Sequence, residues 1–368
     1  MSKLPRIKVA TILGTRPEMI RLSRVIPLFD AVFEHTYIHT GQNYDPTLSD
    51  DVASNLALRA PDVQLQTKAD SLGASLAILF PAIEQVLVER KPDAVLILGD
   101  TNSGLAALLA ARMGIKVYHM EAGNRAFDRA IPEETNRRAI DAVSHFNLVY
   151  TAACRDNLMR EGMHPQRVHV TGSPLLEVLN HYKRKIDASG VVRKLDLSKG
   201  QYILASLHRQ ETVDDPAALA ACIAGLEALS AETGFVVLFS THPRVKDKVP
   251  KSDKIRFVPA IPFTDFVTLQ QSAALVVSDS GTIGEEAAIL GVRAISPRRS
   301  MERPDAMDCG SVVLCGTSIK GILQAGLAQL ALPLPAHIPA DYAVTDTSAR
   351  VAKLIAGTVH ADVFKQAF

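Results

Sequence analysis

Cysteine is scarce in this sequence, and no two cysteines have the spacing of a metal-binding or redox motif. The four residues are Cys154, Cys222, Cys309 and Cys315. Zinc sites and redox-active pairs usually need cysteines a few positions apart, as in CxxC. We therefore expect reduced, mostly buried thiols and no metal site.

An excess of charge of either sign is also lacking. The 368 residues include 40 basic and 39 acidic side chains, so the formal net charge is +1. Such a balance gives no basic face for nucleic acid or for an anionic membrane, and it favours a compact ligand. We expect no nucleic-acid partner.

Long hydrophobic segments are absent as well. The first residues, MSKLPRIKVATIL, lack the apolar core and the small-residue cleavage site of a signal peptide. No apolar run approaches the ~20 residues that a membrane span requires. These absences predict a soluble, cytoplasmic protein without a membrane partner.

Short apolar runs alternate with longer amphipathic stretches, a pattern typical of parallel strands joined by crossover helices. The length and the hydrophobic fraction of 47% favour two α/β domains. The predicted strands are Ile7–Leu13, Thr36–His39, Ala94–Leu98, Val117–Met120, Tyr202–Ser206, Val236–Ser240, Ile255–Val258 and Leu275–Ser278. The clearest helices of the second half lie near residues 215–230, 264–271 and 281–290.

The best domain boundary lies at Val170–Pro174, where turn residues precede a charged stretch. We expect a first Rossmann-like domain over residues 1–172 and a second over residues 173–346. A helix-like segment over about residues 347–368 is expected to pack back on the first domain.

Open parallel sheets bind ligands beyond the carboxyl ends of their strands, so residues that follow predicted strands are the candidates. Gly14–Glu18 combines a glycine turn, a helix start and Arg16, which suits a phosphate; a solvated Arg16 is the alternative. Asp100 follows another strand. It either caps the next helix or serves as an acid or base, and the first role does not exclude the second.

Carboxylates gather after a further strand. Glu121 follows that strand directly, and Glu133 and Glu134 open a helix soon after it. These two glutamates have i,i+4 spacing to Arg137 and Arg138, as on an ordinary salt-bridged surface helix. Alternatively, crowding and burial separate the pKa values of the carboxylates into acid and base roles.

Basic residues follow the first strands of the second half. His208 and His242 end successive strands, and each has an arginine nearby, which for His242 is Arg244. A single histidine in such a place is more often structural. Two at equivalent positions look more like donors that converge on a diphosphate.

The turn Asp279–Glu286 joins a strand to a helix. Ser280 and the neighbouring amides suit a phosphate. Thr282 and Glu285 have the spacing of a capping box, which leaves Glu286 for ribose hydroxyls.

Taken in order, the motifs resemble those of the non-hydrolysing UDP-N-acetylglucosamine 2-epimerase family. The matching motifs are GTRPE, TGQ, GDT, EAG, PEExNR, HR-x-E, HPR, DSG-x-I-x-EE and ERP, over roughly residues 7–316. The resemblance implies a GT-B-like α/β fold of two Rossmann-like domains with parallel sheets, and an active site in the cleft between them. It also implies a homodimer and no cofactor.

The activity implied by the resemblance is inversion of C2 in a UDP-N-acetylhexosamine, in surface polysaccharide precursor synthesis. UDP is eliminated across C1–C2 to leave a 2-acetamidoglucal, and it adds back after protonation on the opposite face. The catalytic candidates are Asp100, Glu121, Glu133 and His208. The candidate contacts of the substrate or UDP are Arg16, Arg21, His242, Arg244, Phe266, Ser280, Gly281, Thr282, Glu286 and Arg303.

The chain departs from the family pattern at several positions. Arg21 stands where a lysine is common, and Thr282 replaces the last glycine of SGG. The loop between Glu121 and Glu133 is shorter than the common form. Asn43–Asp45 replaces a histidine-containing stretch that is linked to allosteric substrate binding in some members, so we expect no such regulation here.

These departures resemble the branch that forms UDP-N-acetyl-L-fucosamine from a 6-deoxy-talose precursor. The sequence leaves that substrate and UDP-N-acetylglucosamine equally open, with other modified UDP-hexosaminuronates as further alternatives behind both. Three other classes remain as alternatives: a hydrolysing epimerase, a GT-B glycosyltransferase that uses a UDP-sugar, and a UDP-sugar sensor without catalysis.

Overall fold

The computed structural model describes residues 6–42, 53–335 and 337–361 of the chain. The expectation about Asn43–Asp45, and the last residues of the predicted final helix, lie outside this part.

Two compact units make up the chain. The first contains the residues up to Asn180 together with the segment from Ala343 onward, and the second runs from His181 to Tyr342. The helix α8, Leu175–Asp187, contains the division.

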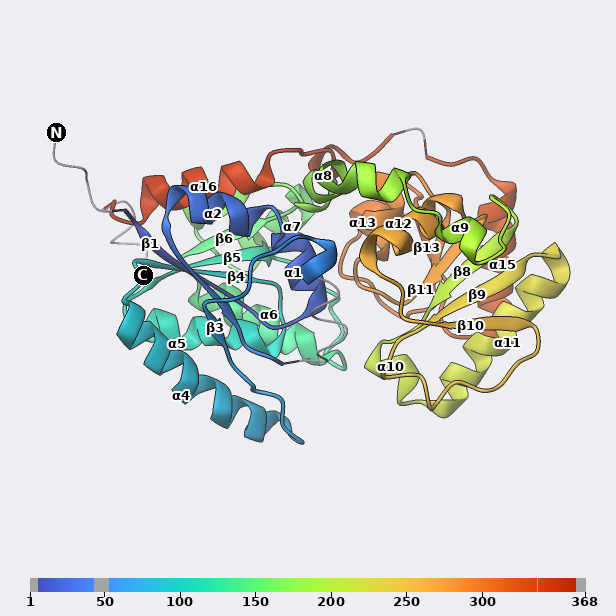
Figure 1. Cartoon of the computed structure of the whole chain (residues 1–368), viewed down its shortest axis with the longest axis horizontal. Helices are drawn as coiled ribbons and strands as arrows, with labels where there is room; N and C mark the ends of the chain where they lie inside the picture. Colours follow the sequence, from blue (N-terminus) through green and yellow to red (C-terminus); the bar gives the residue numbers. More distant parts are fainter. Residues whose placement is uncertain (1–5, 43–52, 336, 362–368) are drawn as a thin grey trace. The chain divides into compact units, whose positions relative to one another are not determined.

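The first unit is built on a seven-stranded parallel sheet with the order β3-β2-β1-β4-β5-β6-β7 (Figure 1). Its strands are β1 Lys8–Leu13, β2 Glu34–His39, β3 Val63–Gln64, β4 Ala94–Leu98, β5 Lys116–Ala122, β6 Phe146–Val149 and β7 Val168–Val170. The four strands predicted for this half are confirmed as β1, β2, β4 and β5. The short strands β3, β6 and β7 escaped the sequence pattern.

Helices cover both faces of this sheet (Figure 1). They are α1 Arg16–Leu22, α2 Val25–Val32, α4 Leu72–Arg90, α5 Ala106–Arg112, α6 Pro132–Val143, α7 Ala152–Arg160 and α16 Thr347–Thr358. The last helix, α16, packs against α2, and its Thr358 hydroxyl lies 2.7 Å from the Tyr118 hydroxyl of β5. The final helix therefore belongs to the first unit although it comes last in the chain.

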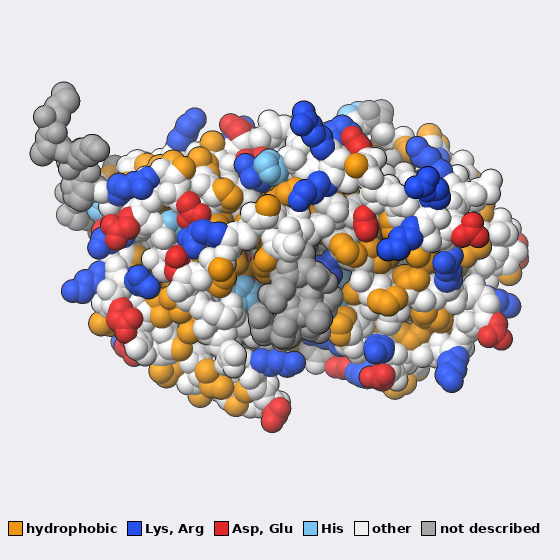
Figure 2. Space-filling model, viewed as in Figure 1, with side chains coloured by type: hydrophobic (Ala, Val, Ile, Leu, Met, Phe, Trp, Pro, Cys, Tyr) orange, Lys and Arg blue, Asp and Glu red, His pale blue; other side chains and the backbone are white. Residues whose placement is uncertain are grey.

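The helix α4 is unusual in its apolar surface. One side packs Leu79, Ile83 and Leu87 into the core, while Leu72, at 57% exposure, and Val88, at 55%, face solvent. Figure 2 shows hydrophobic side chains over α4, as it does over parts of the second unit, with charges of both signs scattered across the visible face. Among the helices within the described ranges, only α4 has the length and hydropathy of a membrane span. The expectation that no segment approaches that composition is wrong here.

The second unit contains a six-stranded parallel sheet with the order β10-β9-β8-β11-β12-β13. Its strands are β8 Tyr202–Ser206, β9 Val236–Thr241, β10 Ile255–Pro259, β11 Leu275–Ser278, β12 Ala294–Ser296 and β13 Val312–Leu314. Its helices are α9 Val191–Lys194, α10 Gln210–Val213, α11 Pro216–Thr233, α12 Phe263–Ser272, α13 Ile283–Leu290, α14 Asp305–Asp308 and α15 Ile319–Ala331. The four strands predicted for this half are confirmed, and β12 and β13 were not predicted.

Each sheet has a topological switch point, where strands that follow one another in the chain diverge to either side. In the first sheet the switch lies between β1 and β4, and in the second it lies between β8 and β11. A doubly wound sheet offers its ligand crevice at the carboxyl ends of such strands. The candidate residues Asp100, His208 and Ser280 all follow switch-point strands.

Candidate active site

The first unit carries a buried ion pair at the carboxyl ends of its strands. The Nη1 atom of Arg21, in the last turn of α1, donates to Oε2 of Glu121 at the end of β5, 3.0 Å away. The Arg21 guanidinium also lies over the Tyr150 ring, 5.4 Å from its centroid. Because the Arg21 side chain is 4% exposed and that of Glu121 is 14% exposed, water screens the pair only weakly.

The backbone at Glu121 is left-handed, with φ of +68°. The pairing of β5 with β6 shifts at this point, from Met120 opposite Leu148 to Ala122 opposite Val149, so Glu121 is an inserted residue. A bulge of this kind redirects a side chain, and a left-handed conformation costs a residue other than glycine about 1–3 kcal/mol. The fold maintains this costly geometry at a carboxylate that is one of the catalytic candidates.

Asp100 lies at the neighbouring strand end. The amide of Gly99 donates to the carbonyl of Met120, which ties the end of β4 to the residue before Glu121. Arg137 of α6 contacts Asp100, with Nη2 2.7 Å from Oδ2. The capping alternative for Asp100 is wrong, because the N-cap of the short 3-10 helix after β4 is Thr101.

The two glutamates that open α6 differ in environment. Glu134 is 2% exposed and contacts Arg138 at 3.0 Å and Arg137 at 3.3 Å. The i,i+4 pair of Glu134 with Arg138 is therefore confirmed. Glu133 lies in the same first turn and is half-buried. Arg137 thus connects the start of α6 to Asp100. The hydrogen bond between Gly99 and Met120 holds Asp100 and Glu121 at neighbouring strand ends.

Glu18 is a further buried acid in this region whose role the sequence did not reveal. Its carboxylate accepts from the amides of Gly14, at 2.7 Å, and Thr15, at 2.9 Å, and from the Thr101 hydroxyl at 2.7 Å. Burial raises the pKa of Glu18 to about 7, although these hydrogen bonds oppose the shift. Glu18 connects the turn after β1, where the half-buried Arg16 lies, to the turn after β4.

In the second unit, Asp279 organises the switch point. Its carboxylate is fully buried and accepts from the amides of His208 and Arg209 at 2.9 Å. Burial raises the pKa of Asp279, and the amide hydrogen bonds oppose that shift. The His208 ring lies 5.4 Å from the His242 ring, and Arg244 donates to the carbonyl of His208. The structure therefore brings His208, His242 and Arg244 together.

The turn after β11 differs from the expectation at its cap. The Thr282 hydroxyl donates to Oε1 of Glu286 at 2.5 Å, and Thr282 makes no side-chain capping bond at the start of α13. The capping box of Thr282 with Glu285 is therefore wrong. Glu285 is fully buried, with Oε2 3.8 Å from Nε of Arg303. Gln270 of α12 donates to the other oxygen of Glu286 at 2.7 Å.

Close packing explains the glycine in this turn. A Cβ atom at Gly281 would lie 2.5 Å from Nη2 of Arg209 and 2.6 Å from Oε1 of Glu302. These two atoms form an ion pair 2.9 Å long, and Glu302 also contacts the buried Arg298 at 2.9 Å. Arg303 donates to the carbonyl oxygen of Gly281. The sequence marks Arg209 only as the arginine beside His208, and it does not reveal Arg298, which follows β12.

Other candidates are accounted for as follows. Phe266 of α12 is half-buried and packs beside the core cluster that includes Leu269. The four cysteines are free thiols, two of them buried. Within the described ranges, no cluster of three or more His, Cys, Asp or Glu side chains is arranged to hold a metal ion.

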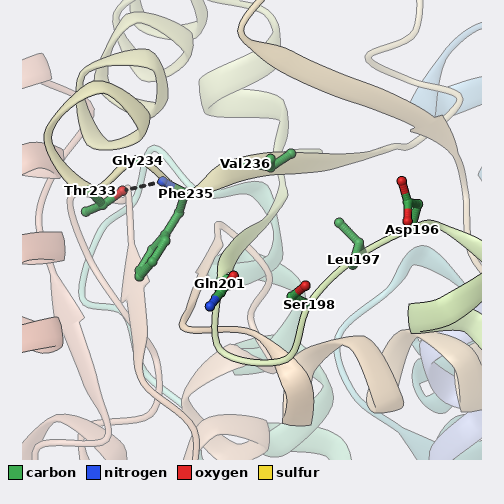
Figure 3. Close-up of a pocket in the computed structure, with 8 residues that line it drawn as sticks. All are labelled: Asp196, Leu197, Ser198, Gln201, Thr233, Gly234, Phe235 and Val236. Carbon is green, nitrogen blue, oxygen red and sulfur yellow. Dashed lines mark hydrogen bonds between the residues drawn. The ribbon is translucent and has the colours of Figure 1, made fainter.

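The second unit also contains a polar pocket (Figure 3). Its lining residues are Asp196, Leu197, Ser198, Gln201, Thr233, Gly234, Phe235 and Val236. They surround the amino ends of β8 and β9, the sheet edge opposite to His208 and His242. The pocket therefore takes no part in the candidate site.

Two Rossmann-like units, each with a parallel sheet and candidate residues at its switch point, define a GT-B-like α/β protein. The fold is shared with Phytolacca americana UGT2, solved with UDP-2fluoro-glucose and pterostilbene, at a TM-score of 0.54 and 12% identity over 97% of this chain and all of that one. The GT-B-like fold class predicted from the sequence is confirmed.

The particular family follows from closer matches. Residues 29–356 match the model of the UDP-N-acetylglucosamine 2-epimerase family. A UDP-N-acetylglucosamine 2-epimerase of Methanococcus maripaludis is 33% identical over 86% of this chain and 90% of its own length. The chain belongs to this family and is an enzyme of its isomerase class.

Solved structures agree with this assignment. A UDP-N-acetylglucosamine 2-epimerase from Rickettsia bellii has a TM-score of 0.89 and 38% identity, covering 96% of this chain and 97% of that one. The Methanocaldococcus jannaschii enzyme, crystallised with UDP-GlcNAc and UDP, has a TM-score of 0.89 and 30% identity, covering 95% and 100%.

Proposed function

We propose that this enzyme inverts C2 of a UDP-N-acetylhexosamine without hydrolysing it. The observation that carries the proposal is the set of carboxylates at adjoining strand ends of the first unit, above all Glu121 in its strained bulge against Arg21. In the second unit, histidine, arginine and backbone amide donors surround the turn at Ser280, which suits a diphosphate.

The reaction needs two kinds of group. A carboxylate removes the C2 proton while the C1–O bond to UDP breaks, which leaves a 2-acetamidoglucal; a second acid then protonates C2 on the other face before UDP adds back. We assign these proton transfers to Asp100, Glu121 and Glu133. His208 contacts the leaving diphosphate, where a ring N–H donor stabilises the developing negative charge.

The UDP moiety is assigned to the second unit and to Arg16. The phosphate oxygens would bind at Ser280, Gly281 and Thr282. His242, Arg244 and Arg303 would make further contacts with UDP. Glu286 would accept from ribose hydroxyls, and Phe266 would lie near uracil. In this proposal the bound intermediate is kept from water, which would otherwise hydrolyse it.

Arg21 contributes charge and no proton. A guanidinium remains protonated in proteins, so it stabilises negative charge on Glu121 or the sugar but does not shuttle protons. The reaction as proposed uses no metal and no redox cofactor, because the eliminated UDP is itself the leaving group and the returning nucleophile.

The proposal also concerns the substituent at C6 of the sugar. Arg21, with the shortened loop before Glu133, supports UDP-2-acetamido-2,6-dideoxy-L-talose and UDP-N-acetyl-L-fucosamine as a pair of substrates, beside UDP-GlcNAc and UDP-ManNAc. In this proposal the enzyme works in the cytoplasm, and its product is a precursor of a surface polysaccharide. A panel that includes both pairs separates them by the ratio of their kcat/KM values.

Proton NMR in deuterated water tests the activity. Deuterium is expected at C2 of substrate recovered before equilibrium, because the proton that is removed exchanges with solvent. An absence of exchange with every UDP-N-acetylhexosamine of the panel would overturn the proposal. Release of free N-acetylmannosamine with UDP would identify a hydrolysing enzyme, and turnover that requires an acceptor would identify a glycosyltransferase.

We also propose that the enzyme forms a homodimer through α4. The support is its exposed apolar side, which includes Ile78, Pro81 and Val88 in a helix whose other side packs in the core. A monomeric soluble protein rarely leaves such a strip uncovered. A second copy of the chain would bury the strip without any change of fold.

A further inference from the structure

Asp141 of α6 is a fully buried carboxylate to which the mechanism above assigns no role. Its Oδ1 atom lies 2.8 Å from Nδ1 of His119, and its Oδ2 atom accepts from Nη1 of Arg125 at 2.7 Å. The amide of Gly123 points at the same carboxylate, 3.3 Å from Oδ2. Burial opposes ionisation, but His119 and Arg125 hold the pKa of Asp141 below its ordinary value.

These partners surround Glu121 in the chain. His119 precedes it by two residues, and Gly123 and Arg125 follow it. A single carboxylate thus fixes the chain on both sides of the bulge. Because the left-handed backbone of Glu121 costs energy, the neighbouring contacts must hold it in place.

The same carboxylate reaches the second acid of the site. The Nε2 atom of His119 donates to the carbonyl oxygen of Gly99 at 2.9 Å, and Gly99 directly precedes Asp100. Asp141, through His119, therefore connects the turn that carries Asp100 to the bulge of β5 that carries Glu121. Both links are completely buried, so water does not compete for them.

We propose that Asp141 is a positioning residue, which acts through His119 and the bulge to hold Asp100 and Glu121 in the geometry that proton transfer requires. The inference rests on the proposed epimerisation. A displacement of about 1 Å in reacting groups costs up to about a hundredfold in rate, so the removal of this anchor should affect turnover far more than binding.

The substitution Asp141→Asn tests this role, because asparagine has the same shape without the charge. The expected result is a decrease in kcat of tenfold to about a hundredfold, measured as deuterium incorporation at C2. The Kd for UDP, measured by titration calorimetry, should change by less than about twofold, since UDP is assigned to the second unit. Asp156→Asn, on the exposed side of α7, is the matched control and should leave both values unchanged.

A purely structural role predicts another pattern. If Asp141→Asn left kcat unchanged, or if kcat and UDP affinity fell together with the folded fraction seen by circular dichroism, the inference would be overturned. The wild-type enzyme distinguishes a failure of this inference from a failure of the proposed function. If the wild type shows no deuterium exchange at C2, the proposed epimerisation is wrong. If the wild type exchanges and Asp141→Asn exchanges at the same rate, only the positioning role is wrong.

His119→Asn provides a second variant in case Asp141→Asn does not fold. The shorter amide can keep the contact to Asp141 but cannot reach Gly99. A decrease in kcat at unchanged UDP affinity is expected, and an unchanged kcat contradicts the link to Asp100. If the two residues act as one unit, the double variant should lose no more than the worse single variant; multiplied losses would mean that they act independently.

Discussion

Arg21 and Glu121 form a buried ion pair that joins the last turn of α1 to the bulge of β5, 3.0 Å between Nη1 and Oε2. The removal of one member of such a pair leaves an uncompensated charge in a poorly hydrated place, which usually costs 3–5 kcal/mol. The pair therefore stabilises the fold, and Arg21 sets the electrostatic environment of Glu121, a proposed catalytic group.

Arg21→Met is expected to lower kcat/KM by about a hundredfold, because one charged donor disappears from the reacting region. Arg21→Lys keeps the charge but loses the planar fork, and we expect a loss of about tenfold. Steady-state kinetics with the preferred UDP-sugar measures both. Arg160→Met, exposed at the end of α7, is the control, and equal losses in Arg160→Met and Arg21→Met would contradict the assignment.

Glu18 makes stability depend on pH. Its pKa is about 7 in the fold and 4.5 when unperturbed, so its contribution is fully present below pH 4.5 and is lost as the pH rises to about 7. In Glu18→Gln this loss is absent. The unfolding free energy of the variant relative to the wild type should therefore rise by on the order of 3 kcal/mol across that window.

Urea denaturation at several pH values measures this difference. Glu84→Gln, exposed on α4, should show no such trend. A constant difference between Glu18→Gln and the wild type from pH 4.5 to 7 would contradict the raised pKa.

Gly281→Ala tests the close packing of the turn after β11. The new methyl group would meet the ion pair of Arg209 and Glu302 at 2.5–2.6 Å, so one of these partners must move. We expect about tenfold weaker UDP binding, or about 1.4 kcal/mol, by calorimetry. Gly190→Ala introduces the same group where nothing lies within 4 Å and should bind UDP normally. Equal affinities of both variants would refute the proposed contact.

The dimer proposal predicts that charges on α4 separate the subunits. Ile78→Lys combined with Val88→Lys should change the mass in light scattering from that of a dimer to that of a monomer, since two ammonium groups would have to be buried. Met159→Lys, on the exposed side of α7 in the same unit, should leave the dimer intact. A monomeric wild type, or a dimer that survives both changes, would contradict the proposal.

The sequence predicts longer apolar strands well and very short ones poorly. It predicts β4 and β11 at their observed bounds, because strands buried on both faces are continuous apolar runs between turn residues. The strands β3 and β12 have two and three residues, too few for any pattern. They form because the neighbouring strands of the sheet provide hydrogen-bond partners, which the local sequence does not reveal.

The candidate site shows a similar limit. Strand ends predict where Asp100, Glu121 and His208 lie in their sheets, since the carboxyl edge follows from topology. The burial of Glu18 depends on Thr101, which is 83 positions away, so the sequence does not show it. The bond of Thr282 to Glu286 in place of Glu285 depends on a side-chain rotamer, and spacing alone does not determine rotamers.

The left-handed backbone of Glu121 has a consequence for any survey of replacements at that position. Glycine would remove the conformational cost of the main chain but also the carboxylate. Most other residues would keep that conformational cost and also lack the carboxylate. Glutamine alone keeps the side-chain shape under the same penalty. Only the Glu121→Gln comparison therefore separates the chemical contribution of the side chain from the cost of its unusual backbone.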